Sequence, residues 1–152
     1  MARRVFFSFH YDNDVWRANQ VRNSNVVAGT DVAGFFDHSE YEEAKKKGSD
    51  AIKRMILRHL NGTSVAVVLI GTETAHRPWV KYEIEQAIAL KNGLLGVQIH
   101  HLKNSAGETS LPGPTPIVPL TVTFPVYKWD GDLDRFRREI EAAGKRADAL
   151  RG

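Results

Sequence analysis

The sequence predicts an α/β fold in which helices flank a largely parallel central sheet. Two segments, 64–70 and 94–99, are apolar almost throughout, as is typical of strands that are buried on both faces of a sheet. Two segments with apolar residues at helical spacing, 49–60 and 78–91, alternate with them. Strands that alternate with helices indicate βαβ units, whose strands run parallel.

The N-terminal elements have shorter patterns. Residues 5–9 form an aromatic, β-prone run that predicts the first strand. A helix is expected from Asp14 to Arg22, followed by a loop at 23–30 and a second short strand at 32–36. Val15, Asn19 and Arg22 would lie on one face of that helix.

The two central helices have clear start and stop signals. Ser49 is suited to cap the helix at 49–60, and Asn61-Gly62 is a typical C-terminal stop. Pro78 fits the first turn of the next helix, because an N–H there has no partner within the helix. Asn92-Gly93 then ends that helix.

The C-terminal third begins with a long loop. Residues 103–125 hold five of the six prolines, which favours irregular structure. Residues 122–127 could form an edge strand that is interrupted by Pro125. A last helix is expected at 132–150. About five strands within a single domain, residues 1–152, suit a flavodoxin-like strand order.

Composition excludes several classes of protein. The 152 residues are 42% hydrophobic and 26% charged, as in globular domains rather than disordered chains or coiled coils. A net charge of only +3 favours no nucleic-acid partner. The absence of cysteine excludes disulfides, thiolate catalysis and Cys-ligated metals. With no secretory signal and no run of about 18 apolar residues, we expect a cytoplasmic protein without a membrane partner.

Ligands of such folds lie at the carboxyl ends of the parallel strands. The positions to consider follow the expected strands: after Phe9, around Asp37, after Ile70 and after Ile99. Phosphate-binding glycine loops, a GxSxG nucleophile elbow and an HExxH zinc motif are absent. The adjacent pair His100-His101 cannot point both rings to the same side of a strand, so we expect no metal site.

Trp79 and Glu83 form the segment with the most distinctive chemistry. They are four residues apart near the start of the helix at 78–91, so they share one face. A helix face that carries an apolar ring and a carboxylate beside a strand end suits a cationic or polyhydroxylated ligand. The alternative interpretation is a tryptophan that covers the core beside a solvated glutamate. Glu85 lies about 200° around the helix from Glu83, so only one of them can face a cleft.

The chain resembles TIR-like domains, and most closely the ThsB family of bacterial Thoeris anti-phage systems. Trp79 and Glu83 match the Trp-x-x-x-Glu element of TIR domains. Arg77 and Pro78 precede the tryptophan, where TIR domains usually have Ser and Cys around it. The similar blocks span about the first two-thirds of the chain: 4–11, 21–23, 36–37, 51–68 and 69–84.

The resemblance implies a TIR-like enzyme that cleaves NAD+ and makes a cyclic ADP-ribose isomer as a signal. The signal would activate a partner effector, a ThsA-like protein, in anti-phage defence, with a phage-derived component as trigger. Glu83 is the implied catalytic residue. The implied substrate-binding residues lie on the same helix and after the first two strands: Trp79, Ser8, Phe9, His10 and Asp37.

This residue set is consistent with that chemistry. Nicotinamide in NAD+ is already a cationic leaving group, so the reaction needs stabilisation of an oxocarbenium-like ribose rather than a strong acid. An ionised Glu83 at the 2′ and 3′ hydroxyls would supply it. Phe9 or Trp79 would stack on a base or exclude water, which decides between hydrolysis and cyclisation. NAD+ is then the substrate, and no cofactor is expected.

Two other classes of function stay open. Many TIR domains signal by self-association without turnover, and the helix faces, including the basic last helix, could serve such contacts. A nucleoside-processing enzyme of similar build, such as a deoxyribosyltransferase-like protein, also uses a carboxylate at a ribose. A scaffold should tolerate Glu83→Ala, and a nucleoside enzyme should ignore NAD+.

Overall fold

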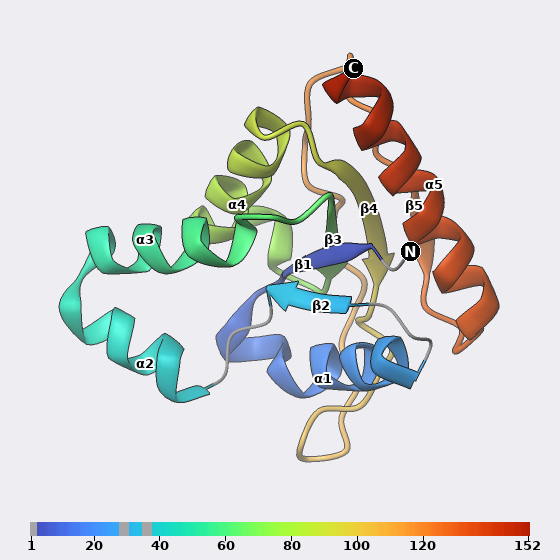
Figure 1. The fold of residues 1–152 in the computed structure, drawn as a ribbon. Coiled ribbons are helices and arrows are strands. Elements are labelled where there is room, and N and C mark those ends of the chain that lie inside the picture. The colour runs from blue at the N-terminus through green and yellow to red at the C-terminus, as the bar shows by residue number, and fades with distance from the viewer. Residues whose placement is uncertain (1–2, 28–30, 35–37) are drawn as a thin grey trace.

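The computed structural model describes residues 3–27, 31–34 and 38–152 (Figure 1). Within them, five parallel strands form one sheet in the order β2-β1-β3-β4-β5. The strands are β1 Arg4–Ser8, β2 Asp31–Gly34, β3 Val65–Ile70, β4 Gly93–Gln98 and β5 Val126–Lys128. The helices are α1 Tyr11–Val27, α2 His38–Lys47, α3 Ser49–Leu60, the short 3-10 helix η1 Thr74–His76, α4 Pro78–Ala89 and α5 Leu133–Arg151. No helix among these residues has the length and apolar character needed to cross a membrane.

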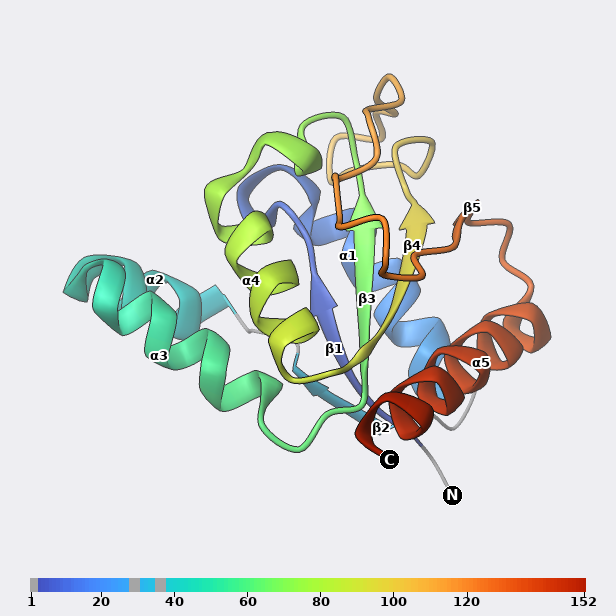
Figure 2. The ribbon, with the colours of Figure 1, turned by 90° about the horizontal axis from the view of Figure 1, so that it is seen from above.

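Helices cover both faces of the sheet, which confirms the predicted α/β class (Figure 2). Residues of α1 and α5 pack on one face, and residues of α3 and α4 pack on the other. Strand β3 lies in the middle of the sheet, and its side chains alternate between the two cores. Val65, Val67 and Leu69 enter the core beneath α1 and α5. Ala66, Val68 and Ile70 enter the core beneath α3 and α4. Burial on both faces explains why this strand is apolar throughout.

The elements of the central and C-terminal parts lie close to their predicted positions. Helix α3 has the predicted bounds, and β3 begins one residue later than predicted. Pro78 is the first residue of α4, which ends at Ala89 rather than Lys91. Residues 99–125, all of them described, contain no helix or strand, and β5 starts directly after Pro125.

Helix α1 differs from the prediction in both length and orientation. It runs from Tyr11 to Val27, so the loop predicted at 23–30 is wrong for residues 23–27. Its predicted face is wrong as well: Val15 and Asn19 are only partly buried and Arg22 is exposed. Ala18 and Val21 of this helix are buried in the core. Asp14 and Arg17 are buried as well, and no apolar pattern could indicate this charged pair.

Helix α2 was not predicted, because it is almost entirely polar. Only Ala44 of its described side chains enters the core. Good helix-forming residues, with Glu40 in the first turn and lysines in the last, stabilise it in place of an apolar face. Strand β2, predicted at 32–36, is described from Asp31 to Gly34, and residues 35–37 lie outside the described part.

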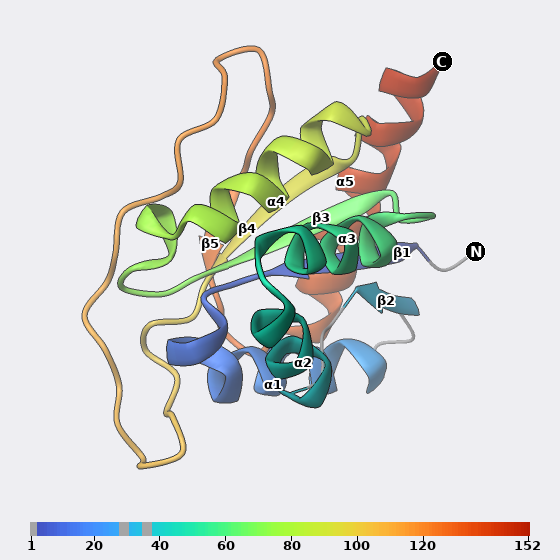
Figure 3. The same cartoon turned by 90° about the vertical axis from the view of Figure 1, so that its left-hand side faces the viewer.

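The long loop 99–125 runs along one edge of the molecule, from the level of α1 past α4 (Figure 3). Its backbone packs directly on the turn that follows β3. A Cβ atom on Gly113 would lie 2.3 Å from the carbonyl oxygen of Thr72, so only glycine permits this approach. The hydroxyl of Thr72 also donates a hydrogen bond to the carbonyl oxygen of Leu111. The loop is therefore attached to the edge of the sheet at which the strands end.

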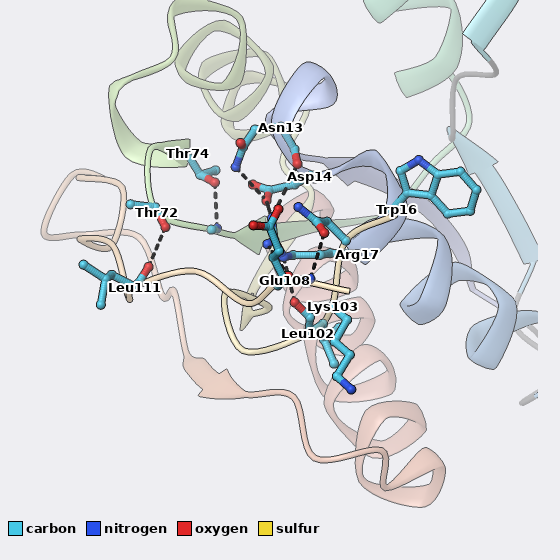
Figure 4. A network of polar contacts seen from close by, with 12 residues as sticks. Asn13, Asp14, Trp16, Arg17, Thr72, Thr74, Leu102, Lys103, Glu108 and Leu111 are labelled. Atoms are coloured by element: carbon cyan, nitrogen blue, oxygen red, sulfur yellow. Dashed lines mark hydrogen bonds and ion pairs between the residues drawn. The ribbon is translucent and has the colours of Figure 1, made fainter. Parts of the chain in front are cut away.

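A buried ion pair holds the start of the same loop to α1 (Figure 4). Arg17 is 1% exposed and donates from Nη1 to Asp14 Oδ1 over 2.9 Å. It also donates to the carbonyl oxygens of Leu102 and Glu108, at 2.8 and 3.0 Å. Burial raises the pKa of Asp14, and the Arg17 guanidinium opposes that rise. Asp14 packs so closely on Gly71 that a Cβ there would lie 2.2 Å from Oδ2.

We expect Arg17→Ala to lower the free energy of unfolding by about 3–5 kcal/mol, because it leaves the Asp14 carboxylate buried without its partner. Urea denaturation at pH 7 measures this change. Lys47→Ala is the control, since Lys47 forms an exposed ion pair with Glu43 worth less than about 0.5 kcal/mol. If Arg17→Ala lowers the free energy of unfolding by no more than the control does, the buried ion pair does not have the proposed effect on stability.

Candidate active site

Glu83 projects from α4 into the protein at the carboxyl end of β1. The side chain is buried, with 4% of its surface exposed. Ser8, the last residue of β1, donates a hydrogen bond from Oγ to Glu83 Oε1 over 2.8 Å. Because Pro78 fixes where α4 begins, the register of the helix places the carboxyl group beside this strand end. Two elements far apart in the sequence thus meet at one carboxyl group.

Burial changes the protonation of Glu83. Desolvation raises the pKa of this carboxyl from 4.5 to about 8, against a smaller opposing effect of the Ser8 hydrogen bond. At pH 7 the free protein therefore holds Glu83 largely in its neutral form. The sequence-based expectation of an ionised Glu83 concerns the complex with NAD+ and stays a prediction. A positive charge brought into contact with this group would lower its pKa and favour ionisation.

A small cavity of about 50 Å³, open to solvent at its mouth, lies beside Glu83. Residues of β1 and the turn after it form one side, and residues of α3 and the start of α4 form the other. The lining side chains are mostly apolar or aromatic: Phe7, Phe9, His10, Tyr11, Asp12, Ile52, Met55, Ile56, Arg77, Pro78, Trp79, Val80 and Glu83. A concave apolar surface around one carboxyl group is typical of a small-molecule site.

Most of the site residues predicted from the sequence meet here. Phe9, His10 and Trp79 line the cavity together with Glu83. Ser8 does not line it; that residue is buried and contacts Glu83 instead. The predicted substrate-binding residue Asp37 lies outside the described residues.

Aromatic rings form much of the cavity wall. Phe9 and Tyr11 are stacked, with ring centroids 5.9 Å apart. Trp79 packs edge-to-face on Tyr82, at 5.8 Å between centroids, which orients the indole beside the cavity. Tyr11 is among the positions that follow the first strand, where ligands of such folds bind, but it was not among the predicted substrate-binding residues.

The other chemical candidates do not gather at this cavity. Glu85 is exposed on the outer side of α4, as the helical spacing predicts. His100 and His101 lie after β4, and the Nε2 atom of His101 is 2.7 Å from the carbonyl oxygen of Trp129. In the described part of the chain, no three His, Asp or Glu side chains come close enough together to hold a metal ion.

The family model described as "Thoeris protein ThsB, TIR-like domain" matches residues 6–104, which is more than half of the chain. The chain belongs to this ThsB TIR-like family. The match contains every cavity residue, and the resemblance seen in the sequence is confirmed. This ThsB-family chain is also 41% identical over 140 residues to the "Putative cyclic ADP-D-ribose synthase ThsB1" of Bacillus cereus (strain MSX-D12). The alignment covers 86% of this chain and 73% of that relative.

The raised pKa of Glu83 makes stability depend on pH. Between pH 4.5 and about 8 the folded protein holds a proton that the unfolded chain has lost, so rising pH favours unfolding. We expect the free energy of unfolding of the wild type to fall through this range, relative to Glu83→Gln, by up to about 1.4 kcal/mol per pH unit. Urea denaturation across the pH range measures the difference.

Glu85→Gln is the control for this prediction, because Glu85 sits on the same helix but is exposed. Its stability should follow the wild type at every pH. Parallel curves for the wild type and Glu83→Gln would mean that Glu83 titrates normally in the folded protein.

Removing the Ser8 hydroxyl should raise the pKa of Glu83 above its wild-type value, since the hydrogen bond favours the ionised form. A ¹³C NMR titration of the glutamate carboxyl groups in Ser8→Ala measures this shift. Ser64→Ala, at the opposite edge of the sheet, should leave the titration unchanged. An unchanged midpoint in Ser8→Ala would show that the hydroxyl does not act on this carboxyl.

Proposed function

We propose that this chain cleaves NAD+ at its nicotinamide–ribose bond and closes the ADP-ribose into a cyclic isomer. The observation that carries the proposal is the buried Glu83 at the base of an aromatic cavity, in a chain 41% identical to a protein named as a putative cyclic ADP-D-ribose synthase. The carboxyl group and the aromatic wall fit the two demands of this reaction, a stabilised cation and a site with little water.

Glu83 would act through its charge. The pyridinium ring of NAD+ is positive, and its approach would lower the pKa of Glu83 from about 8, so that the bound carboxyl ionises. When the bond from C1′ to the ring nitrogen breaks, the electron pair leaves with nicotinamide and positive charge develops on the ribose. A carboxylate beside the 2′ and 3′ hydroxyls stabilises that charge, and the low dielectric of the cavity strengthens the effect.

The aromatic wall would select the acceptor of the ribose. Water at C1′ gives linear ADP-ribose, whereas a nucleophilic group of the same molecule gives a ring and releases a proton to solvent. Phe9 and Trp79 border the cavity that holds Glu83, so they would limit the water near C1′. The proposal therefore assigns cyclisation as the main reaction and hydrolysis as the side reaction.

The family resemblance supports the following biological setting as part of the proposal. The cyclic product would bind a ThsA-like effector, and a phage-derived component would trigger synthesis. NAD+ is the substrate rather than a resident cofactor. The reaction would take place in the cytoplasm, where NAD+ and an infecting phage genome are both present.

An interaction module is the second candidate function, because the loop 99–125 exposes large apolar side chains. Leu111, Ile117 and Leu120 lie almost entirely in solvent. A protein that only binds partners would keep its effect on the cell when Glu83 is changed, so the same variant separates the two candidates.

We expect bacteria that express the wild type to accumulate a small molecule with the mass of a cyclic ADP-ribose after phage infection. Glu83→Gln should lower its amount by at least about 100-fold, because the substitution removes the charge that stabilises the cation. Mass spectrometry of cell extracts measures the product.

Glu85→Gln is the matched control and should leave the product at the wild-type level, since this exposed carboxylate faces away from the cavity. Wild-type amounts of product in cells with Glu83→Gln would refute the role of Glu83. Absence of product from the wild type across several phages would favour the interaction module.

A further inference from the structure

Arg77 is the one described cavity residue with a permanent positive charge. It directly precedes α4, and its side chain is exposed at the mouth of the cavity that holds Glu83. None of the described residues forms a side-chain hydrogen bond or ion pair with it. Arg17 and Arg146, in contrast, donate hydrogen bonds to backbone carbonyls.

The charges around the mouth leave the Arg77 guanidinium available for an anion. Asp12, the acidic residue on the opposite rim, lies 3.9 Å from the ammonium group of Lys45. His10 borders the same space, and its pKa is lowered by burial and next by the positive charge of Arg77. Asp14, Asp12 and Glu73 act on the pKa of His10 in the opposite direction.

The spacing of Arg77 and Glu83 matches two parts of one ligand. Glu83 is six positions after Arg77, which corresponds to about 9 Å along a helix axis, and the glutamate side chain leans back toward the helix start. In NAD+ the diphosphate is joined through the 5′ carbon to the same ribose whose C1′ carries nicotinamide. A ribose held at Glu83 thus has its diphosphate near the mouth.

We propose that Arg77 binds the diphosphate of NAD+ while the nicotinamide ribose lies against Glu83, an inference that rests on the proposed function. The planar guanidinium donates paired hydrogen bonds that match two phosphate oxygens. Arg77 is then a specificity-determining residue: it makes the site select a dinucleotide over a nucleoside, which offers the same ribose and nicotinamide without the diphosphate.

The test measures ligand binding in the Glu83→Gln variant, in which NAD+ should not be cleaved. Isothermal titration calorimetry would compare Glu83→Gln alone with Glu83→Gln combined with Arg77→Ala, Arg77→Lys or Lys81→Ala, using NAD+ and nicotinamide riboside as probes. Lys81 is the matched control, because it is an exposed cation one turn further along α4 and does not line this cavity.

Arg77→Ala should weaken NAD+ binding by about 10- to 100-fold and leave nicotinamide riboside unaffected. Arg77→Lys should recover part of the affinity, and Lys81→Ala should change neither ligand. Equal NAD+ affinities with Arg77→Ala and Lys81→Ala would overturn the inference, as would an equal loss for both probes. The proposed function fails separately: NAD+ binding that depends on Arg77, with no cyclic product from infected wild-type cells, would keep the phosphate site and reject the cyclase.

Discussion

The carboxyl group of Glu83 is enclosed by apolar and aromatic side chains and receives one hydrogen bond from Ser8. Burying a carboxyl in this way is unfavourable for its charged form, which is why its pKa rises to about 8. The free site is therefore neutral, and a cationic ligand supplies the charge that ionises it. In the mechanism that we propose, NAD+ binding and ionisation of Glu83 would be one event, and the same carboxyl would discriminate against ligands that carry no positive charge.

The rest of the fold holds the two halves of this site together. Strand β1 supplies Ser8 and, directly after it, Phe9 and His10, while α4 supplies Trp79 and Glu83. Both elements end or begin at the carboxyl edge of a parallel sheet, where backbone groups are free and side chains converge. The buried pair of Asp14 and Arg17 then attaches the long loop to α1, next to the residues that follow β1. Hydrogen bonds to backbone carbonyls, as well as side-chain packing, therefore hold the loop 99–125 at the carboxyl ends of the strands, where the site lies.

Patterns of apolar residues predicted the parts of the chain that bury apolar surface. Strand β3 and helices α3 and α4 were predicted closely, and the shared face of Trp79 and Glu83 followed from helical spacing. The same reasoning failed for α1, because its inner face contains the ion pair of Asp14 and Arg17, which reads as a solvated surface. It missed α2, a polar helix with little apolar pattern. The raised pKa of Glu83 depends on the burial of a single carboxyl, and only the three-dimensional arrangement reveals it.

The most direct measurement is a crystal structure of Glu83→Gln soaked or grown with NAD+. We expect the nicotinamide ribose in the cavity with its 2′ and 3′ hydroxyls at the substituted side chain, the rings of Phe9 and Trp79 beside the ligand, and the diphosphate at Arg77. NAD+ bound elsewhere on the surface, or in this cavity with its adenine end at position 83, would contradict the assignment of Glu83 to the reacting ribose.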